Sequence, residues 1–437
     1  MNGFTNDFLW GAATAAAQIE GGWNVEGRTP SIWDVAPASK IKNGDSCHES
    51  CDHFHRWKED VALMKELGLK SYRFSVSWSR VIPEEGQINR AGIEFYSNLV
   101  DELLKNGIEP IVTIFHWDMP VWVYRKGGWL SESIIPLFHE YTRVLVDALS
   151  DRVQWWIPMN EPQCFIMNGY MQGEHAPFRH NYLALSRLTR ICMLAFSESV
   201  EEIRSHAKRT PKIGIAMASG AFVPASEKTV DVEKARRQTT ETGLGLMSNC
   251  WWMDPILAGK PVSAYGVYHT NTKFLAKIHQ QLDFLGLNIY QPFNTANWGG
   301  DGSKPVPGAP KTSMGWIIDE RVMYWAVRFL YERYKLPIMI TENGMANVDA
   351  VSLDGGVHDP QRADFMKRYL RELKRAVDEG YPVIGYQHWS LLDNFEWAEG
   401  YDPRFGLIYV DYPTGKRIMK DSAQIYKHII ETNGAEL

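Results

Sequence analysis

Two glutamates lie where buried strands are expected to end, and together they indicate a reaction that uses a pair of carboxyl groups. Glu161 follows the apolar run 153–159, and Glu342 follows the apolar run 337–341. If both strands belong to one sheet, the two carboxyl groups face a common cavity. Paired carboxyl groups cleave glycosidic bonds when one is a protonated acid and the other is an ionised nucleophile or base. The alternative is that each glutamate only caps a strand end or forms an ion pair there, which is the weaker explanation for both together.

Other polar and aromatic side chains gather at the same ends of the expected strands. Arg73 is a candidate partner for one carboxylate, because a cation within about 4–6 Å lowers a carboxyl pKa. An indole face can pack on the apolar face of a sugar, while amide, imidazole and carboxyl groups can bond its hydroxyls. The residues in this set are Gln18, Arg73, His116, Trp117, Asn160, Asn288, Tyr290, Trp389, Glu396 and Trp397.

Short apolar runs alternate with longer amphipathic segments along the whole chain. Strands are predicted at 8–16, 71–78, 110–117, 153–159, 212–219, 283–290, 337–341 and 382–390. Helices are predicted at 53–67, 91–106, 132–150, 182–207, 234–257, 320–334, 360–379 and 421–431. Gly68, Gly107 and Gly380 stand where three of these helices need a left-handed residue to end.

Eight strands, each followed by a helix, predict an α/β protein with a single closed (β/α)8 TIM barrel and elaborated βα loops. The prediction is one catalytic domain over residues 1–437. A doubly wound open sheet with a second domain is the alternative. The glycine- and proline-rich stretch 298–310 is expected to be a long loop at the rim of the site.

Composition narrows the class of protein further. The chain of 437 residues has a net charge of −6 and is 45% hydrophobic, which excludes a disordered chain and argues against nucleic-acid or anionic-membrane partners. No apolar stretch of about 18 residues occurs and no secretory signal is visible, so no membrane span is expected. The 5 cysteines are an odd, sparse set, so reduced thiols and a cytoplasmic location are predicted.

One segment, from Cys47 and His48 to Cys51, His53 and His55, has the residue types of a metal site. It lacks a second ligand pair at structural-zinc spacing, so a loop that leads into a helix is the favoured interpretation. We therefore expect no metal and no cofactor.

Seven motifs, taken in order, resemble glycoside hydrolase family 1, the β-glucosidase family. The resemblance covers essentially the whole chain, from Phe8 to about Tyr426. The motifs are FLWGAATAAAQIEG, YRFSVSWSR, FHWDMP, MNEP, DFLGLNIY, ITENG and HWSLLDNFEWAEGYDPRFGLIYVDY.

The resemblance implies a metal-free retaining enzyme that releases terminal, non-reducing β-D-glycosyl residues by double displacement. By position, Glu161 matches the acid/base of the NEP motif, and Glu342 matches the nucleophile of the TENG motif. The residues that match the sugar-binding set are Gln18, His116, Trp117, Asn160, Glu396 and Trp397, with Trp389 beneath the sugar. Arg73, Asn288 and Tyr290 match residues that support the nucleophile and the reacting ring.

The resemblance also narrows the substrate, a small β-glycoside or oligosaccharide. Glu161, where thioglucosidases have glutamine, implies an O-glycosidase, and the carboxylate of Glu396 implies a sugar without phosphate. Ala17 and Gln163 depart from the family's usual aromatic residues and leave the aglycone open. Galactosidase or fucosidase activity, transglycosylation, a non-catalytic sugar-binding barrel and the oligomeric state also remain open.

Overall fold

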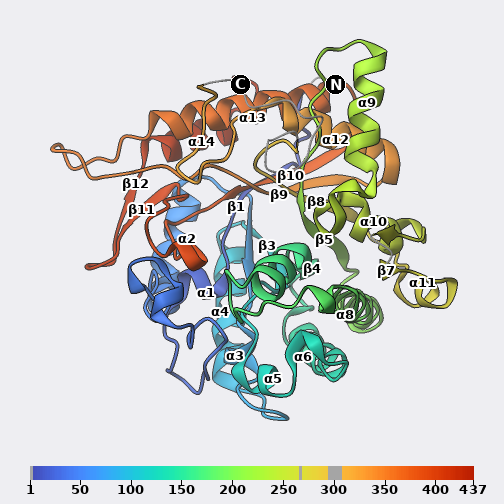
Figure 1. Ribbon diagram of the computed structural model, residues 1–437. Coiled ribbons are helices and arrows are strands. Elements are labelled where there is room, and N and C mark those ends of the chain that lie inside the picture. The colour runs from blue at the N-terminus through green and yellow to red at the C-terminus, as the bar shows by residue number, and fades with distance from the viewer. Residues whose placement is uncertain (1–2, 265–267, 294–307) are drawn as a thin grey trace.

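Eight parallel strands form a closed barrel around the centre of the molecule (Figure 1). The computed structural model describes residues 3–264, 268–293 and 308–437. The hydrogen-bonded order around the barrel is β1-β10-β9-β8-β5-β4-β3-β2. The strands are β1 (Leu9–Ala13), β2 (Ser71–Ser75), β3 (Glu109–Phe115), β4 (Trp155–Met159), β5 (Lys212–Ser219), β8 (Phe284–Ile289), β9 (Ile338–Asn343) and β10 (Val383–Trp389).

Amphipathic helices cover the outside of this barrel, as Figure 1 shows. In α4, for example, Phe95, Leu99 and Leu103 recur every fourth position and are all buried. The covering helices are α2 (His53–Glu66), α4 (Arg90–Lys105), α6 (Ile134–Leu149), α8 (Leu185–His206), α10 (Asn249–Ala258), α12 (Arg321–Tyr334), α13 (Pro360–Asp378) and α14 (Asp421–Glu431).

The barrel prediction is confirmed, and the open-sheet alternative is wrong because β1 pairs with both β2 and β10. Every predicted strand overlaps a barrel strand. Gly68, Gly107 and Gly380 have φ values of 75°, 75° and 92°, as their place after a helix requires. The stretch 298–310 lies outside the described residues except for 308–310.

One predicted helix is wrong in its extent. The segment 234–257 is divided into α9 (Thr229–Thr240), a 3₁₀ turn (Thr242–Met247) and α10. Gly245 adopts φ 57° and ψ −132°, a conformation that no helix can contain. Ser248 then accepts a hydrogen bond from the backbone N–H of Cys250 and begins α10 as its N-cap.

An apolar layer fills the barrel interior below the carboxyl ends of the strands. On β3 and β9, its members Ile111 and Met339 lie two residues before Thr113 and Thr341, so they point to the same side of their strands. The layer consists of Ile111, Trp155, Ile157, Ala216, Phe284 and Met339. This packing makes the lower barrel a solid core rather than a channel.

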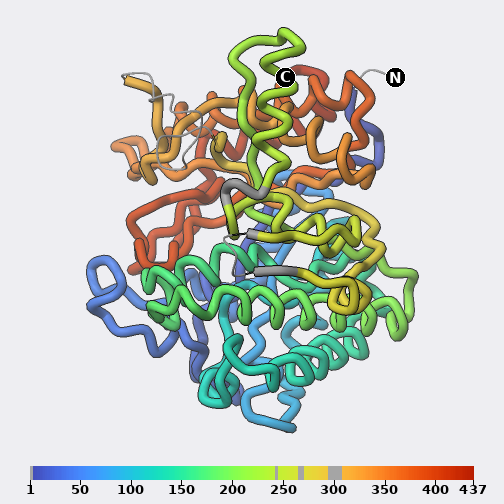
Figure 2. Tube along the Cα trace, turned by 45° about the vertical axis from the view of Figure 1, so that its right-hand side comes forward, coloured from blue at the N-terminus to red at the C-terminus, as the bar shows by residue number. Residues whose placement is uncertain are grey.

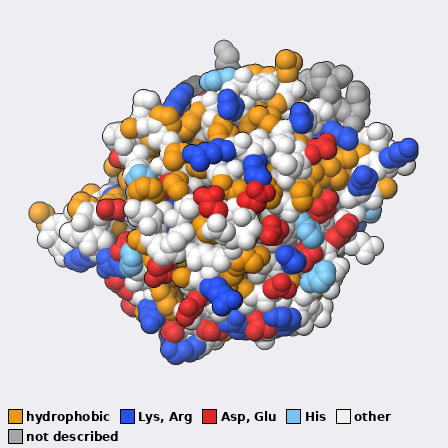
Figure 3. All heavy atoms as spheres, turned by 90° about the horizontal axis from the view of Figure 1, so that it is seen from below, with side chains coloured by type: hydrophobic (Ala, Val, Ile, Leu, Met, Phe, Trp, Pro, Cys, Tyr) orange, Lys and Arg blue, Asp and Glu red, His pale blue; other side chains and the backbone are white. Residues whose placement is uncertain are grey.

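Smaller elements decorate the barrel. The hairpin β11 (Ile408–Asp411) and β12 (Lys416–Met419) follows the last barrel strand, and α9 projects beyond the barrel (Figures 1 and 2). The two ends of the chain meet, because Asn433 hydrogen-bonds both Trp10 and the carbonyl of Phe4. Acidic and basic side chains are intermixed over the face in Figure 3. Within the described residues, no helix is long and apolar enough to cross a membrane.

Candidate active site

The carboxyl ends of the barrel strands enclose a cavity of about 830 Å³ that contains both predicted glutamates. Glu342 belongs to the end of β9, and Glu161 lies between β4 and the short helix α7 (Pro162–Cys164). Their side chains are almost fully buried, at 4% and 7% exposed. The prediction that two remote strand ends converge on one cavity is therefore confirmed.

Glu342 has a cation and a hydroxyl on its two oxygens. Arg73 donates from Nη1 to Oε1 over 2.6 Å, and the Tyr290 hydroxyl donates to Oε2 over 2.8 Å. Burial raises the pKa of Glu342 above its usual value, while the charge and hydrogen bond of Arg73 and the hydrogen bond of Tyr290 reduce that rise. These contacts make Glu342 easier to ionise than an equally buried carboxyl group that has no cation beside it.

Glu161 has no such cation. Asn288 donates from Nδ2 to its Oε1 over 2.8 Å, and the thiol of Cys164 is a further hydrogen-bond partner. Burial, followed by the nearby charge of Glu342, raises the pKa of Glu161 to about 8. At neutral pH the Glu161 carboxyl group is therefore protonated, and no cation is in contact with it.

Asn160 joins the surroundings of the two glutamates. Its Oδ1 accepts from Arg73 over 2.6 Å and from Asn288 over 3.1 Å, and its Nδ2 lies 3.1 Å from Nε2 of His116. The indole of Trp117 donates to the Asn160 carbonyl over 3.0 Å. With both glutamates and Tyr290, eight of the predicted site residues thus form one connected set of hydrogen bonds.

A second group of predicted residues lies around Glu396. Gln18 donates from Nε2 to Glu396 over 3.2 Å, to Asn394 Oδ1 over 2.9 Å and to the Phe395 carbonyl over 2.9 Å. Burial, followed by the charge of Glu342, raises the pKa of Glu396 to about 8. Two carboxyl groups of this cavity are therefore neutral at pH 7.

The predicted aromatic residues form one wall of the cavity. His116 stacks on Trp389 with ring centroids 5.7 Å apart, and Trp117 lies 4.9 Å from Trp397. Tyr290 lies against Trp316, at 5.1 Å, on another part of the lining. Burial lowers the pKa of His116 well below its usual range, so this imidazole is neutral and adds no cation to the cavity.

Not every predicted residue reaches the cavity surface. Those that line it are His116, Trp117, Glu161, Asn288, Tyr290, Glu342, Trp389, Glu396 and Trp397. Arg73, Asn160 and Gln18 are fully or almost fully buried behind that lining. Direct contact of Asn160 and Gln18 with a sugar stays a prediction.

The backbone is unusual at the same place. Trp117, Glu161 and Trp397 have φ values of 78°, 41° and 57°, in the left-handed region that non-glycine residues seldom adopt. Such conformations persist only where the surroundings enforce them, and they concentrate at functional sites. Gly344, next to the end of β9, lies so close to the Trp389 carbonyl that an added Cβ would be 1.8 Å from that oxygen.

Sequence reasoning missed several residues that support the site. Thr341 donates to Asn288 Oδ1 over 2.6 Å and so aims the amide of Asn288 at the glutamates. Thr113 accepts from Arg73 Nε over 3.1 Å. Cys164 follows Glu161 by three residues, a helical spacing that could have indicated its position on the same side of α7.

The segment with metal-ligand residue types has scattered partners. The Cys47 thiol donates to Asp34, and the Cys51 thiol donates to the Asp393 carbonyl. His53 pairs with Asp60 on α2. In the part of the chain that the structure describes, no group of three His, Cys, Asp or Glu side chains is arranged to hold a metal ion.

A closed barrel with two buried carboxyl groups of unequal surroundings in an aromatic cavity defines a class of protein, the glycoside hydrolases. A model of glycosyl hydrolase family 1 matches residues 1–435, and the chain belongs to this family. It is similar to β-glucosidase A of Thermotoga maritima, with 40% identity over 99% of each chain. It is also similar to a 1,4-β-D-glucan glucohydrolase of Thermotoga neapolitana, with 39% identity over 99% of each chain.

A solved structure agrees with these sequence relatives. The β-glucosidase of Thermotoga maritima in complex with glucoimidazole superimposes with a TM-score of 0.90 at 40% identity, covering 99% of this chain and 100% of that one. The recognition of the family from its motifs is therefore confirmed, and the protein is a glycoside hydrolase.

Proposed function

We propose that this protein is a retaining β-glucosidase that removes terminal, non-reducing β-D-glycosyl residues from small glycosides. The observation that carries the proposal is the unequal setting of two carboxyl groups in one cavity. Glu342 has Arg73 at 2.6 Å, whereas Glu161 has a pKa raised to about 8 and an amide as partner. An ionised nucleophile beside a protonated acid is what the first step of retention requires.

In that first step Glu342 attacks the anomeric carbon and the bond from that carbon to the leaving oxygen breaks. Glu161 donates its proton to the leaving oxygen, so that a neutral aglycone departs. Oxocarbenium character develops on the sugar during the attack. We assign Asn160 to bond the 2-hydroxyl, because its amide is held between Arg73 and Asn288 close to both glutamates.

The second step uses the same pair with their charges exchanged. Once Glu342 is bound as an ester it carries no charge, so it no longer raises the pKa of Glu161. Glu161 gave up its proton in the first step, and its lowered pKa keeps it ionised. It can therefore act as the base that takes a proton from water. That water attacks the anomeric carbon, and Glu342 leaves as a carboxylate.

Retention needs carboxyl groups about 5–5.5 Å apart, against about 6.5–9.5 Å for inversion. The side-chain amide of Asn288 is a hydrogen-bond partner of Glu161 and also lowers the pKa of Glu342 through a hydrogen bond. One amide group that reaches both carboxyl groups supports the shorter separation.

The charges of the cavity support a substrate whose sugar carries no phosphate group. Glu342 is the ionised member, Glu396 ionises near pH 8, and Arg73 is already committed to Glu342 and Asn160. At pH 7 a phosphate dianion would meet the charge of Glu342, and the neutral Glu396 carboxyl group would give it no cation as a partner. The glucoimidazole bound by the relative from Thermotoga maritima supports a glucose-like ring here.

Two further predictions belong with this function. We propose that residues 1–437 act as one catalytic domain on a small soluble substrate. The five cysteines have no disulfide partners, which supports a reducing compartment such as the cytoplasm.

The test is a panel of aryl β-glycosides with gluco, galacto, fuco and 6-phosphogluco groups, with the product anomer followed by NMR. We expect the glucoside to be cleaved, and the β-anomer of glucose to appear before mutarotation. If the α-anomer appears first, the enzyme inverts. If a sugar acceptor replaces water as the main recipient, the protein is a transglycosylase, and if nothing is cleaved the barrel only binds sugar.

A further inference from the structure

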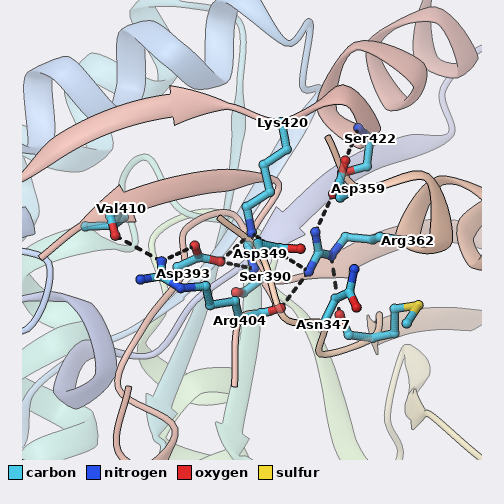
Figure 4. Close-up of polar contacts among 12 residues, drawn as sticks. Asn347, Asp349, Asp359, Arg362, Ser390, Asp393, Arg404, Val410, Lys420 and Ser422 are labelled. Atoms are coloured by element: carbon cyan, nitrogen blue, oxygen red, sulfur yellow. Dashed lines mark hydrogen bonds and ion pairs between the residues drawn. The ribbon is translucent and has the colours of Figure 1, made fainter. Parts of the chain in front are cut away.

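Outside the cavity, a buried group of ionised side chains joins the segments that follow β9 and β10 to the last helices of the barrel (Figure 4). We name it the buried ion cluster. It contains three acidic and three basic residues, each in an ion pair with a member of opposite sign. They are Asp349, Asp359, Arg362, Asp393, Arg404 and Lys420.

Lys420 connects two of the segments. Its Nζ lies 2.5 Å from Asp349 Oδ2 and 2.6 Å from Asp393 Oδ1, and its side chain is 0% exposed. Figure 4 shows the side chain reaching down between the two carboxyl groups. Burial lowers the pKa of Lys420, and the charges of Asp393 and Asp349 oppose that change. An ammonium group in this position is stable only with both partners present.

Asp393 holds the segment after β10 in several directions. Its Oδ1 accepts from Lys420 and also from the backbone N–H of Gly406 over 2.9 Å, while its Oδ2 accepts from Arg404 over 2.7 Å. Its own backbone N–H donates to the Ile408 carbonyl on β11. Asp393 therefore has little freedom to move relative to Lys420.

The next residue carries this constraint to the sugar-facing side. Asn394 Oδ1 accepts from Gln18 over 2.9 Å, and the same Gln18 amide donates to Glu396 over 3.2 Å. Asn394 Nδ2 is fixed in turn by Ser390 Oγ at 2.9 Å. A continuous series of contacts thus runs from Lys420 through Asp393 and Asn394 to the Glu396 carboxyl group.

The other side of the cluster leads to the nucleophile strand. Arg362 donates to Asp349 over 2.7 Å and from Nε to the carbonyl of Met345 over 3.3 Å. Met345 follows Glu342 by three residues. The cluster therefore sets the position of the segment carrying Glu396 relative to the segment carrying Glu342.

We propose that Lys420 is a positioning residue for recognition of the terminal sugar, which it secures by holding Asp393 and, through Asn394 and Gln18, the carboxyl group of Glu396. The inference depends on the proposed function, because it concerns the same cavity. Lys420 itself is fully buried and is not one of the residues that line the cavity. Its effect on the sugar is exerted entirely through other residues.

The experiment compares Lys420→Met with the wild-type enzyme at a temperature well below both melting points. Methionine keeps an unbranched apolar stem, one atom shorter than that of lysine, and removes both ion pairs. We expect the KM for an aryl β-glucoside and the Kd for glucoimidazole to rise by about tenfold, because a small displacement of binding groups has a large effect. The preference for the glucoside over the galactoside should fall in the same variant.

Arg333→Met is the matched control, because Arg333 pairs with Asp254 on the outer helices at 2.5 Å. It should lower the melting temperature and leave KM, Kd and the sugar preference unchanged. Asn394→Ala is the second variant. It keeps every member of the buried ion cluster and removes the connection to Gln18, so it should raise KM and Kd even if Lys420→Met does not fold.

Unchanged KM, Kd and sugar preference in Lys420→Met would show that the pair only stabilises the fold. An equal rise in Arg333→Met, or unchanged binding in Asn394→Ala, would also overturn the inference. A wild-type enzyme that binds glucoimidazole but cleaves no glycoside would contradict the proposed function and leave the Kd comparison intact.

Discussion

The sugar-facing cavity and the buried ion cluster each contain three carboxyl groups that are buried or partly buried, but they balance the charge in opposite ways. In the cluster, three aspartates meet three cations. In the cavity, Glu161, Glu342 and Glu396 share one hydrogen-bonded cation among the described residues, Arg73. The acidic groups of both regions are buried or partly buried, and the two regions differ clearly in the number of cations paired with them.

The consequences for protonation are opposite. Burial acts to raise the pKa of Asp349, yet Lys420 and Arg362 hold it below its usual range. Burial and the charge of Glu342 raise the pKa of Glu161 to about 8, with no cation in contact to reverse the effect. Where each carboxylate has a cation, the carboxylates stay ionised and hold neighbouring segments together. Where cations are too few, a carboxyl group keeps its proton and can donate it at neutral pH.

The largest expected effect comes from removing the ionised member of the cavity. Glu342→Gln replaces the nucleophile with an amide that cannot form the glycosyl ester, so kcat for an aryl β-glucoside should fall by at least about 10³-fold. Steady-state rates measure this. Asp364→Asn, which changes an exposed carboxylate on α13, is the control and should retain full activity. Activity within tenfold of wild type in Glu342→Gln would place the nucleophile elsewhere.

Removing Arg73, the cation paired with Glu342, should increase the excess of carboxyl groups over cations in the cavity. Arg73→Met should raise the pKa of Glu342, because Arg73 opposes the effect of burial there. Glu342 must be ionised to attack, so the acidic limb of kcat/KM against pH should move about 1–2 units upward. Arg362→Met removes a cation from the buried ion cluster instead, and should lower the melting temperature with the acidic limb in its wild-type place. If the acidic limb of the Arg73→Met profile stays at the wild-type pH, the contrast in charge balance between the cavity and the buried ion cluster is wrong.

The smallest expected effect is on stability. The Glu161 pKa rises from 4.5 to about 8 on folding, so the folded protein holds a proton that the unfolded chain releases between these pH values. Wild-type stability therefore falls as pH rises through this window. Glu161→Gln removes the penalty, and its melting temperature should exceed that of wild type by about 2 °C or more at pH 8.5, with no gain at pH 5.

Asp349→Asn is the mirror experiment. The Asp349 pKa is lowered on folding, so its contribution to stability is present above the usual carboxyl pKa of 3.8 and lost as pH falls through the lowered value. The variant should melt below wild type at pH 8.5. Equal shifts of the same sign in Glu161→Gln and Asp349→Asn would mean that the two regions do not differ in charge balance.

Much of the fold and the centre of the site could be predicted from the sequence, for a local reason. Apolar runs mark the barrel strands, and the residue that follows a parallel strand must lie at the carboxyl end of the barrel. This rule was enough to bring together Glu161 and Glu342. Arg73 lies within β2, and its long side chain reaches Glu342 from 269 positions away in the sequence.

The remainder depends on packing that has no local signature. Asp393 and Lys420 look like surface charges in the sequence, and no barrel strand fixes where Lys420 lies after β12. The place of Gln18 behind the cavity lining likewise depends on Asn394, 376 positions away. The break in the segment 234–257 could not be placed by helical periodicity, because it is a change of backbone conformation rather than of pattern: Glu241 is extended after α9, and Gly245 has a non-helical backbone in the 3₁₀ turn that follows.

The apolar layer of Ile111, Trp155, Phe284 and their neighbours closes the reaction chamber at the floor of the barrel. The departing aglycone and the incoming water therefore both pass on the side of the carboxyl ends of the strands. In the proposed mechanism the aglycone leaves before water attacks, and the sugar leaves last. If the glycosyl-enzyme of the proposed mechanism accepts alcohols, an alcohol on that side of the barrel would compete with water for it, and more new glycoside would form as the alcohol concentration rises.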